Sequence, residues 1–226
     1  AQLMGQTPQE TTINASHRRY VTPTGAYSNR GTTWADAKNN IQDAINDLVA
    51  SHLLPGEVWV KEGTYRPTES TESGGSSLYA SFKIPAGITV RGGFAGNEVT
   101  LNDRMVKYID KDGKTVGTAK IGDTFDKDYT EKRFRHPTIL TGDLSSRPAN
   151  FTWNDQSHRY ATQFYGNAYH VVWFATNGFD SKGRANALQL NDDSWTATLE
   201  GMIIKRGYAY NSSLEGHPHN AYGGGA

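Results

Sequence analysis

The sequence predicts an all-β fold made of stacked repeats, and three observations support this prediction. Short segments rich in β-branched and aromatic residues recur from residue 57 onward, separated by Gly, Pro, Asn and Asp. The centres of five such segments lie near residues 59, 89, 139, 172 and 203, so that successive spacings are 30, 50, 33 and 31 residues. Only one segment, before residue 57, has clear helical periodicity. A period of about 30 residues, interrupted by one long insertion, is typical of a stacked array.

The helical segment is expected over residues 33–50. Its apolar residues recur every three or four positions, as they do on one face of a helix. They are Trp34, Ala37, Ile41, Ala44, Ile45, Leu48 and Val49. Thr32 or Thr33 is the expected N-cap, Asp36 lies in the first turn, and Pro55-Gly56 ends the segment. We expect the apolar face to cover a core.

Two other fold classes fit less well. A doubly wound α/β sheet needs crossover helices, and no second helical pattern follows any strand segment. A β-sandwich would place turns every 8 to 12 residues. The Asn177-Gly178 pair is a hairpin signal that keeps the sandwich open as an alternative.

The long insertion covers residues 97–136. It is dense in charged side chains and is too polar to supply much core. We therefore expect it to form an outward loop or a small hairpin.

Composition excludes several classes of function. The 23 Lys and Arg residues balance 23 Asp and Glu residues, so nothing indicates a nucleic-acid partner or a polybasic membrane anchor. The absence of cysteine excludes disulfides, thiolate zinc sites, iron–sulfur clusters and cysteine nucleophiles. No apolar run is long enough to predict a membrane-spanning helix.

The order of several short motifs resembles the N-terminal part of bacterial right-handed parallel β-helix surface proteins. The similarity is to the polymorphic outer-membrane-protein type, which is common among secreted proteins of the Bacteroidetes. It covers residues 19–226 without the insertion. The matching segments are Arg19-Tyr20-Val21 and residues 33–37, 41–45, 58–67, 92–98, 138–143, 199–204 and 223–226.

This resemblance implies a right-handed parallel β-helix, a single-stranded solenoid like that of pectate lyases, with an N-terminal α-helical cap. Residues 1–18 would be an N-terminal arm, residues 19–56 the cap and residues 57–226 the coils, with the charged insertion at 97–136. The helix would cover the unpaired strand edges at one end. Because Gly223-Gly224-Gly225 would open a further coil, the chain is expected to be cut from a longer protein at residue 226.

The resemblance also implies a location and a role. The protein would be secreted or lie on the outer membrane of a Gram-negative bacterium, with its signal peptide already removed. Its role would be adhesion, glycan contact or scaffolding, without a catalytic group in this segment, and its partner a glycan or another surface protein. One alternative is a polysaccharide lyase or glycoside hydrolase whose groove lies partly beyond residue 226. Another is a stalk or assembly subunit whose open C-terminal end stacks on a partner.

Aromatic residues give the predicted contact site. Phe151, Trp153, Tyr160 and Tyr165 crowd into one short stretch beside Asn154 and Asp155. Rings exposed on a flat β-surface bind sugars through their faces. The alternative interpretation is that half of these rings pack inside and the others cover a loop.

Two further patterns have competing interpretations. Lys205-Arg206 replaces the small neutral turn expected from the resemblance and could act as base and carboxylate neutraliser of a lyase. Neighbours in a strand point to opposite faces, however, which favours two solvated side chains at a turn. His217-Pro218-His219 offers two imidazoles without an evident third metal ligand.

No cofactor is predicted, and calcium is left open. The alternating acids in residues 110–113 and 123–128 supply oxygen ligands of the kind that calcium prefers. Neither run completes an EF-hand loop, and the interleaved lysines indicate ordinary surface charge.

Overall fold

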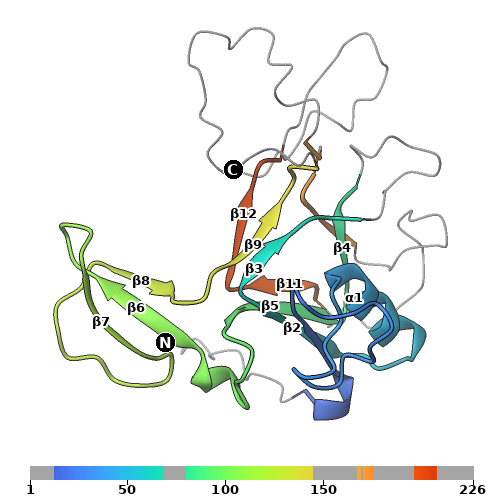
Figure 1. The fold of residues 1–226 in the computed structure, drawn as a ribbon, viewed down its shortest axis with the longest axis horizontal. Coiled ribbons are helices and arrows are strands. Elements are labelled where there is room, and N and C mark those ends of the chain that lie inside the picture. Colours follow the sequence, from blue (N-terminus) through green and yellow to red (C-terminus); the bar gives the residue numbers. More distant parts are fainter. Residues whose placement is uncertain (1–12, 69–79, 145–166, 169, 176–195, 208–226) are drawn as a thin grey trace, which may run out of the picture.

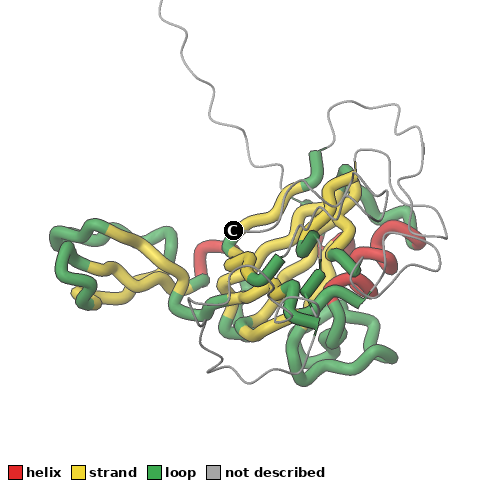
Figure 2. Tube along the Cα trace, turned by 90° about the horizontal axis from the view of Figure 1, so that it is seen from above, coloured by secondary structure: helices red, strands yellow, loops and turns green. Residues whose placement is uncertain are grey.

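The computed structural model describes residues 13–68, 80–144, 167–168, 170–175 and 196–207 (Figure 1). These residues form three short parallel β-sheets, one antiparallel β-sheet and one α-helix. The parallel sheets and the helix lie together, and the antiparallel sheet extends away from them (Figures 1 and 2).

The largest sheet has four parallel strands in the order β1-β2-β5-β11. The strands are β1 (Arg18–Val21), β2 (Gly56–Lys61), β5 (Ile88–Phe94) and β11 (Thr198–Glu200). Because strand side chains alternate between faces, the register decides which residues share a face.

That register divides the sheet into an apolar and a charged face. Val58, Val90 and Leu199 are partners on adjacent strands and contribute to the main core. On the other face, Trp59 is the partner of Arg91, and Arg91 is the partner of Glu200.

Two smaller parallel sheets complete the body. One has the order β12-β9-β3 and contains β3 (Gly63–Tyr65), β9 (Thr138–Thr141) and β12 (Met202–Lys205). The other pairs β4 (Phe82–Pro85) with β10 (Val172–Ala175).

The helix α1 (Ile41–Ala50) packs its apolar face into the same core as the parallel sheets. Ile41, Ala44, Ile45 and Leu48 are buried there together with residues of β2, β4 and β5. Arg19 of β1 also makes an ion pair with Asp47 of the helix.

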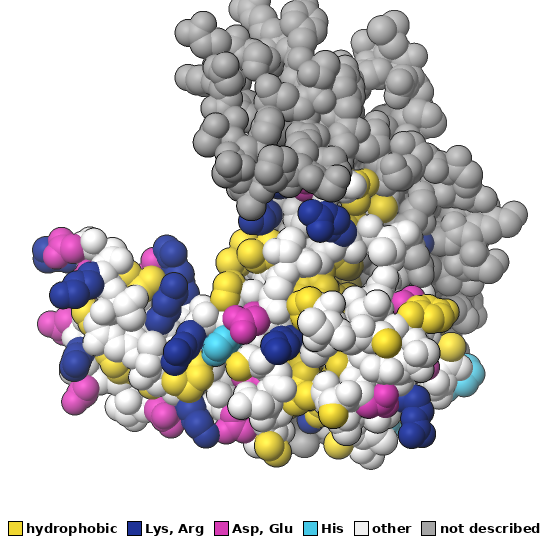
Figure 3. All heavy atoms as spheres, viewed as in Figure 1, with side chains coloured by type: hydrophobic (Ala, Val, Ile, Leu, Met, Phe, Trp, Pro, Cys, Tyr) yellow, Lys and Arg dark blue, Asp and Glu magenta, His cyan; other side chains and the backbone are white. Residues whose placement is uncertain are grey.

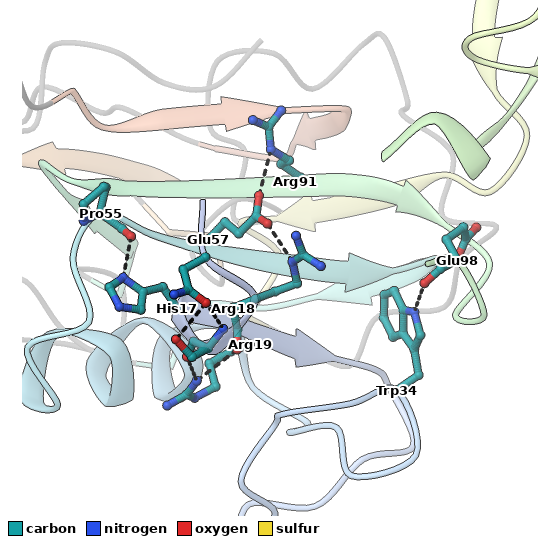
Figure 4. Close-up of polar contacts among 10 residues, drawn as sticks. His17, Arg18, Arg19, Trp34, Pro55, Glu57, Arg91 and Glu98 are labelled. Atoms are coloured by element: carbon teal, nitrogen blue, oxygen red, sulfur yellow. Dashed lines mark hydrogen bonds and ion pairs between the residues drawn. The ribbon is translucent and has the colours of Figure 1, made fainter. Parts of the chain in front are cut away.

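The predicted start of the helix is wrong. Asn40, not Thr32 or Thr33, is the N-cap, and its side chain accepts hydrogen bonds from the N–H groups of Gln42 and Asp43. Trp34 belongs to the preceding loop, where its indole N–H donates to the carbonyl of Glu98 (Figure 4). The loop also covers the free edge of β1, because Tyr20 exchanges backbone hydrogen bonds with Gly31 and Lys38.

Residues from the charged insertion form the antiparallel sheet, with strand order β7-β6-β8. The strands are β6 (Met105–Ile109), β7 (Thr115–Lys120) and β8 (Glu131–Phe134). We call these three strands and their connecting turns, residues 105–134, the projecting sheet. It is a three-stranded unit rather than the loop or small hairpin expected.

The predicted fold class, an all-β right-handed parallel β-helix with an N-terminal helical cap, is wrong. The described residues show a mixed architecture of short sheets, parallel and antiparallel, and a helix whose apolar face shares their core. The repeat spacing was misleading for a physical reason. Any two parallel neighbours need a long connection between them, so a spacing of about 30 residues does not by itself require a solenoid.

Gln42 covers the edge of β4 that does not pair with β10, a role that the sequence pattern did not predict. Its side-chain carbonyl accepts from the Lys83 N–H at 2.8 Å, and its amide donates to the Lys83 carbonyl at 3.2 Å. The buried side chain therefore replaces a neighbouring strand, in the way that natural sheets protect their edges.

We predict that Gln42→Leu lowers the free energy of unfolding by about 2–4 kcal/mol, because two buried backbone groups of Lys83 lose their hydrogen-bond partner. Denaturant unfolding followed by circular dichroism measures the change. Ala50→Leu, on the exposed face of the same helix, is the control and should change stability by less than about 0.5 kcal/mol. Equal stability of the two variants would contradict the role of Gln42.

Candidate functional site

A row of alternating charges runs across the outer face of the four-stranded sheet. Glu57 lies between Arg18, at 2.6 Å, and Arg91, at 3.3 Å (Figure 4). Arg91 also pairs with Glu200, and Glu200 accepts from Arg104 at 2.7 Å. Each carboxylate thus has two guanidinium partners, which offsets the loss of water around Glu57, whose side chain is only 3% exposed.

Aromatic rings fill the space beside this row. Trp59 and Phe94 stack with ring centroids 4.6 Å apart, and Trp34 packs against both of them. The Arg18 guanidinium lies 3.8 Å from the Trp59 ring centre. Because Trp59 and Phe94 are fully buried, these rings stabilise the sheet and offer no platform to a ligand.

The base of the projecting sheet is seated on this layer. Phe134 of β8 lies against Gly93 so closely that a Cβ on Gly93 would be 2.4 Å from its ring. Arg104, which precedes β6, donates to the carbonyl of Gly92 and to Glu200, and its guanidinium lies 4.9 Å from the Phe134 ring centre. Apolar contact by Phe134 and charge pairing by Arg104 therefore both attach the projecting sheet to the body.

An aromatic trio, Tyr108, Phe125 and Tyr129, packs on one face of the projecting sheet. Tyr108 and Phe125 stack with centroids 3.8 Å apart, and Tyr129 meets Tyr108 edge-on at 4.7 Å. Gly117, the partner of Tyr108 on β7, makes room, because a Cβ there would lie 2.5 Å from the Phe125 ring. Tyr108 is buried, whereas Tyr129 is 46% exposed.

The opposite face of the projecting sheet is polar and open. Lys120 donates to Asp103 at 2.8 Å, and this hydrogen bond is the main cause that lowers the pKa of Asp103. Arg133 likewise lowers the pKa of Glu131. Lowered carboxyl pKa values favour folding above the unfolded-state values and lose that effect as the pH falls. Such exposed pairs add little stability. Figure 3 shows Lys, Arg, Asp and Glu side chains gathered over the projecting sheet.

The four residues predicted to contact a glycan, Phe151, Trp153, Tyr160 and Tyr165, lie outside the described residues. The two histidines of the 217–219 pattern also lie outside them. The hypotheses for these positions remain predictions.

Lys205 and Arg206 have different surroundings in the structure. Lys205 is exposed at the end of β12. Arg206 has a left-handed backbone, with φ 62°, and donates to the Asp143 carboxylate at 2.6 Å. The alternative interpretation, two solvated side chains, therefore describes Lys205 but not Arg206.

The first acidic run, left open as a calcium site, forms a turn closed by Asp110. Asp110 uses its Oδ1 to accept from the N–H groups of Asp112 and Lys114 in the β6–β7 turn. In the part of the chain that the structure describes, no group of three or more His, Cys, Asp or Glu side chains could hold a metal ion. No helix among the same residues is long and apolar enough to cross a membrane.

Sequence reasoning missed the aromatic trio because its rings are spread through a segment that the charged residues dominate. The signal available was four aromatic residues within a highly charged insertion, Tyr108, Phe125, Tyr129 and Phe134. Comparisons with models of protein families, with curated proteins and with solved structures found no match. The candidate site is therefore defined by geometry alone: a firmly seated, projecting sheet with one aromatic ring half open to solvent.

We predict that Gly93→Ala weakens the attachment of the projecting sheet. Gly113→Ala is the matched control, because both glycines have positive φ, 86° and 79°, but only Gly93 has atoms within 4 Å of the added Cβ. The backbone cost of about 1 kcal/mol is common to both variants, and the clash with Phe134 adds about 1–3 kcal/mol for Gly93.

Hydrogen exchange measured by mass spectrometry, together with denaturant unfolding, tests this difference. Backbone exchange in residues 105–134 should rise in Gly93→Ala and not in Gly113→Ala beyond its own turn. Equal exchange in the two variants would contradict the attachment of the projecting sheet through Phe134 and Gly93.

Proposed function

We propose that this chain is a non-catalytic contact module of a secreted or cell-surface bacterial protein, and that the projecting sheet contacts a glycan. The observation that carries the proposal is the exposed Tyr129 ring, held by two other rings on a sheet that stands away from the body (Figures 1 and 2). The location is inferred from the sequence resemblance to bacterial surface proteins.

The packing of the aromatic trio supports a contact role. A sheet that served only to stabilise the body would turn its largest rings toward it. Here Phe134 is the ring of the projecting sheet that lies against Gly93 of the body. Tyr108 of β6 instead stacks on Phe125, which lies in the connection between β7 and β8. The rings therefore shape a surface of the projecting sheet itself.

The chemistry of Tyr129 fits a sugar. An aromatic face packs against the C–H groups of a pyranose ring, and a phenol hydroxyl offers a hydrogen bond to its hydroxyl groups. The edge-on contact with Tyr108 restricts the Tyr129 side chain before binding, so that less rotamer freedom is lost on contact.

The described carboxylates support a non-catalytic role. Glu57 and Glu200 each bridge two guanidinium groups of the outer face, and Asp143 pairs with Arg206. These ion pairs with arginines engage all three carboxylates, so none of the three is placed to act as a general base.

We predict that the protein binds a subset of glycans on an array and that Tyr129→Ala weakens this binding roughly two- to tenfold, which is what the loss of one aromatic contact is worth. Tyr27→Ala is the matched control, since Tyr27 is also exposed but lies in the loop before α1. Affinities for the best array ligands are then measured by biolayer interferometry.

The control variant should bind like the wild type. Folded wild-type protein that binds no glycan, or a Tyr129→Ala variant with unchanged affinity, would reject the proposal. Circular dichroism of each variant shows whether the fold is retained.

A further inference from the structure

A second polar cluster lies at one edge of the sheet β12-β9-β3. Because the three strands are parallel, the residues that follow them meet at the same edge. Arg66 follows β3, Asp143 comes shortly after β9, and Arg206 follows β12. The strand order places the carboxylate between the two arginines.

The contacts hold both guanidinium groups next to Asp143. Arg206 donates to its Oδ2 at 2.6 Å, and Arg66 donates through Nε to its backbone carbonyl at 2.7 Å. The Asp143 side chain is only 2% exposed, whereas Arg66 is exposed and Arg206 is 33% exposed. Among the described residues, two guanidinium groups are thus held at one buried carboxylate.

Within the part of the chain that the structure describes, these arginines use little of their hydrogen-bonding capacity. A guanidinium group has five N–H donors. Within the described residues, each of the two groups makes only its single contact to Asp143. Both are therefore oriented by Asp143 with donors left for an anion.

The backbone is adapted to this arrangement. Arg206 adopts the left-handed conformation, which a non-glycine residue enters only at an energetic cost. A Cβ on Gly142 would lie 2.3 Å from the Arg206 carbonyl oxygen, so the close approach also requires a glycine before Asp143. A glycine at position 206 would avoid this cost but would lose the hydrogen bond to Asp143.

Asn167 supplies an independent sign that the cluster is incomplete. It pairs with Asp143 in an isolated antiparallel bridge and is only 3% exposed. Its Oδ1 is buried and accepts no hydrogen bond. A buried acceptor without a donor is costly, and a hydroxyl group brought by a ligand would satisfy it.

We propose that Arg66 and Arg206 bind the carboxylate of a hydroxylated organic acid, of which a sugar acid is the simplest example. The planar guanidinium groups match a carboxylate, and a ligand hydroxyl donates to Asn167. This site is separate from Tyr129 and does not rest on the function proposed for the projecting sheet.

The test is a titration followed by saturation-transfer difference NMR, with D-glucuronate as the probe. D-glucose is the neutral counterpart, and inorganic phosphate is an oxyanion that lacks the carbon-bound hydroxyl groups. Glucuronate should bind at least tenfold more tightly than either of them. Equal affinity for glucose or for phosphate, or no binding of glucuronate to the folded wild type, overturns the proposal.

Variants assign the binding to these residues. Arg66→Gln and Arg206→Gly should each weaken glucuronate binding tenfold or more, as expected for a charge-assisted hydrogen bond. Arg206→Gly also removes the partner of the buried Asp143 carboxylate, so circular dichroism must show that this variant is folded. Arg66→Gln leaves that ion pair in place and therefore reports on binding without this loss. Lys205→Gln, which removes the same charge next to Arg206, should bind like the wild type, and so should Tyr129→Ala. Unchanged affinity in both arginine variants would refute the site.

Discussion

The ion-pair row on the outer face of the four-stranded sheet is the interaction on which the other features depend. Strand alternation turns Val58 and Val90 into the core, and the same alternation places Glu57 and Arg91 on the opposite face. Glu57 is only 3% exposed there, so its charge must be paired. The pairing continues through Glu200 to Arg104, which joins the projecting sheet to the body. The orientation of the contact surface is therefore set by the register of the parallel sheet.

Individual strands and the buried face of the helix could be predicted from the sequence, but the pairing of strands into sheets could not. The apolar runs at 57–61 and 138–141 are strands, and the apolar stripe through Ile45 and Leu48 does cover a core. The pattern could not show which strands share a sheet, because parallel partners such as β5 and β11 are joined by long connections of arbitrary course. The helix start was missed because Thr33 and Asn40 are both good caps. The helix begins after Asn40 because Trp34 makes tertiary contacts with Tyr20 and Glu98, which keep it in the preceding loop.

The residues of the candidate sites could not be predicted from the sequence for a different reason. The stacking of Tyr108 on Phe125 depends on a turn that folds back over the sheet, and the many charges around it masked an apolar cluster. Arg206 was singled out by the sequence as one half of a pair with Lys205. Its actual partner, Asp143, is 63 residues away along the chain and becomes adjacent only through the pairing of β9 with β12. A sequence motif pairs residues that are adjacent in the chain, whereas this contact joins residues on two paired strands.

The use of guanidinium donors separates the structural arginines from those available to a ligand. Arg104 is buried, and its Nε, NH1 and NH2 groups bond to Leu101, Gly92 and Glu200. Because this guanidinium group is buried and its charge is balanced by Glu200, it is not accessible to a ligand. Arg66 and Arg206 are held just as definitely, since each is fixed on Asp143, but a single contact leaves the rest of each fork open. A fixed orientation, with donors that make no hydrogen bond to the described residues, is an arrangement that recognises an anion at low entropic cost, because the side chains are ordered before the ligand arrives.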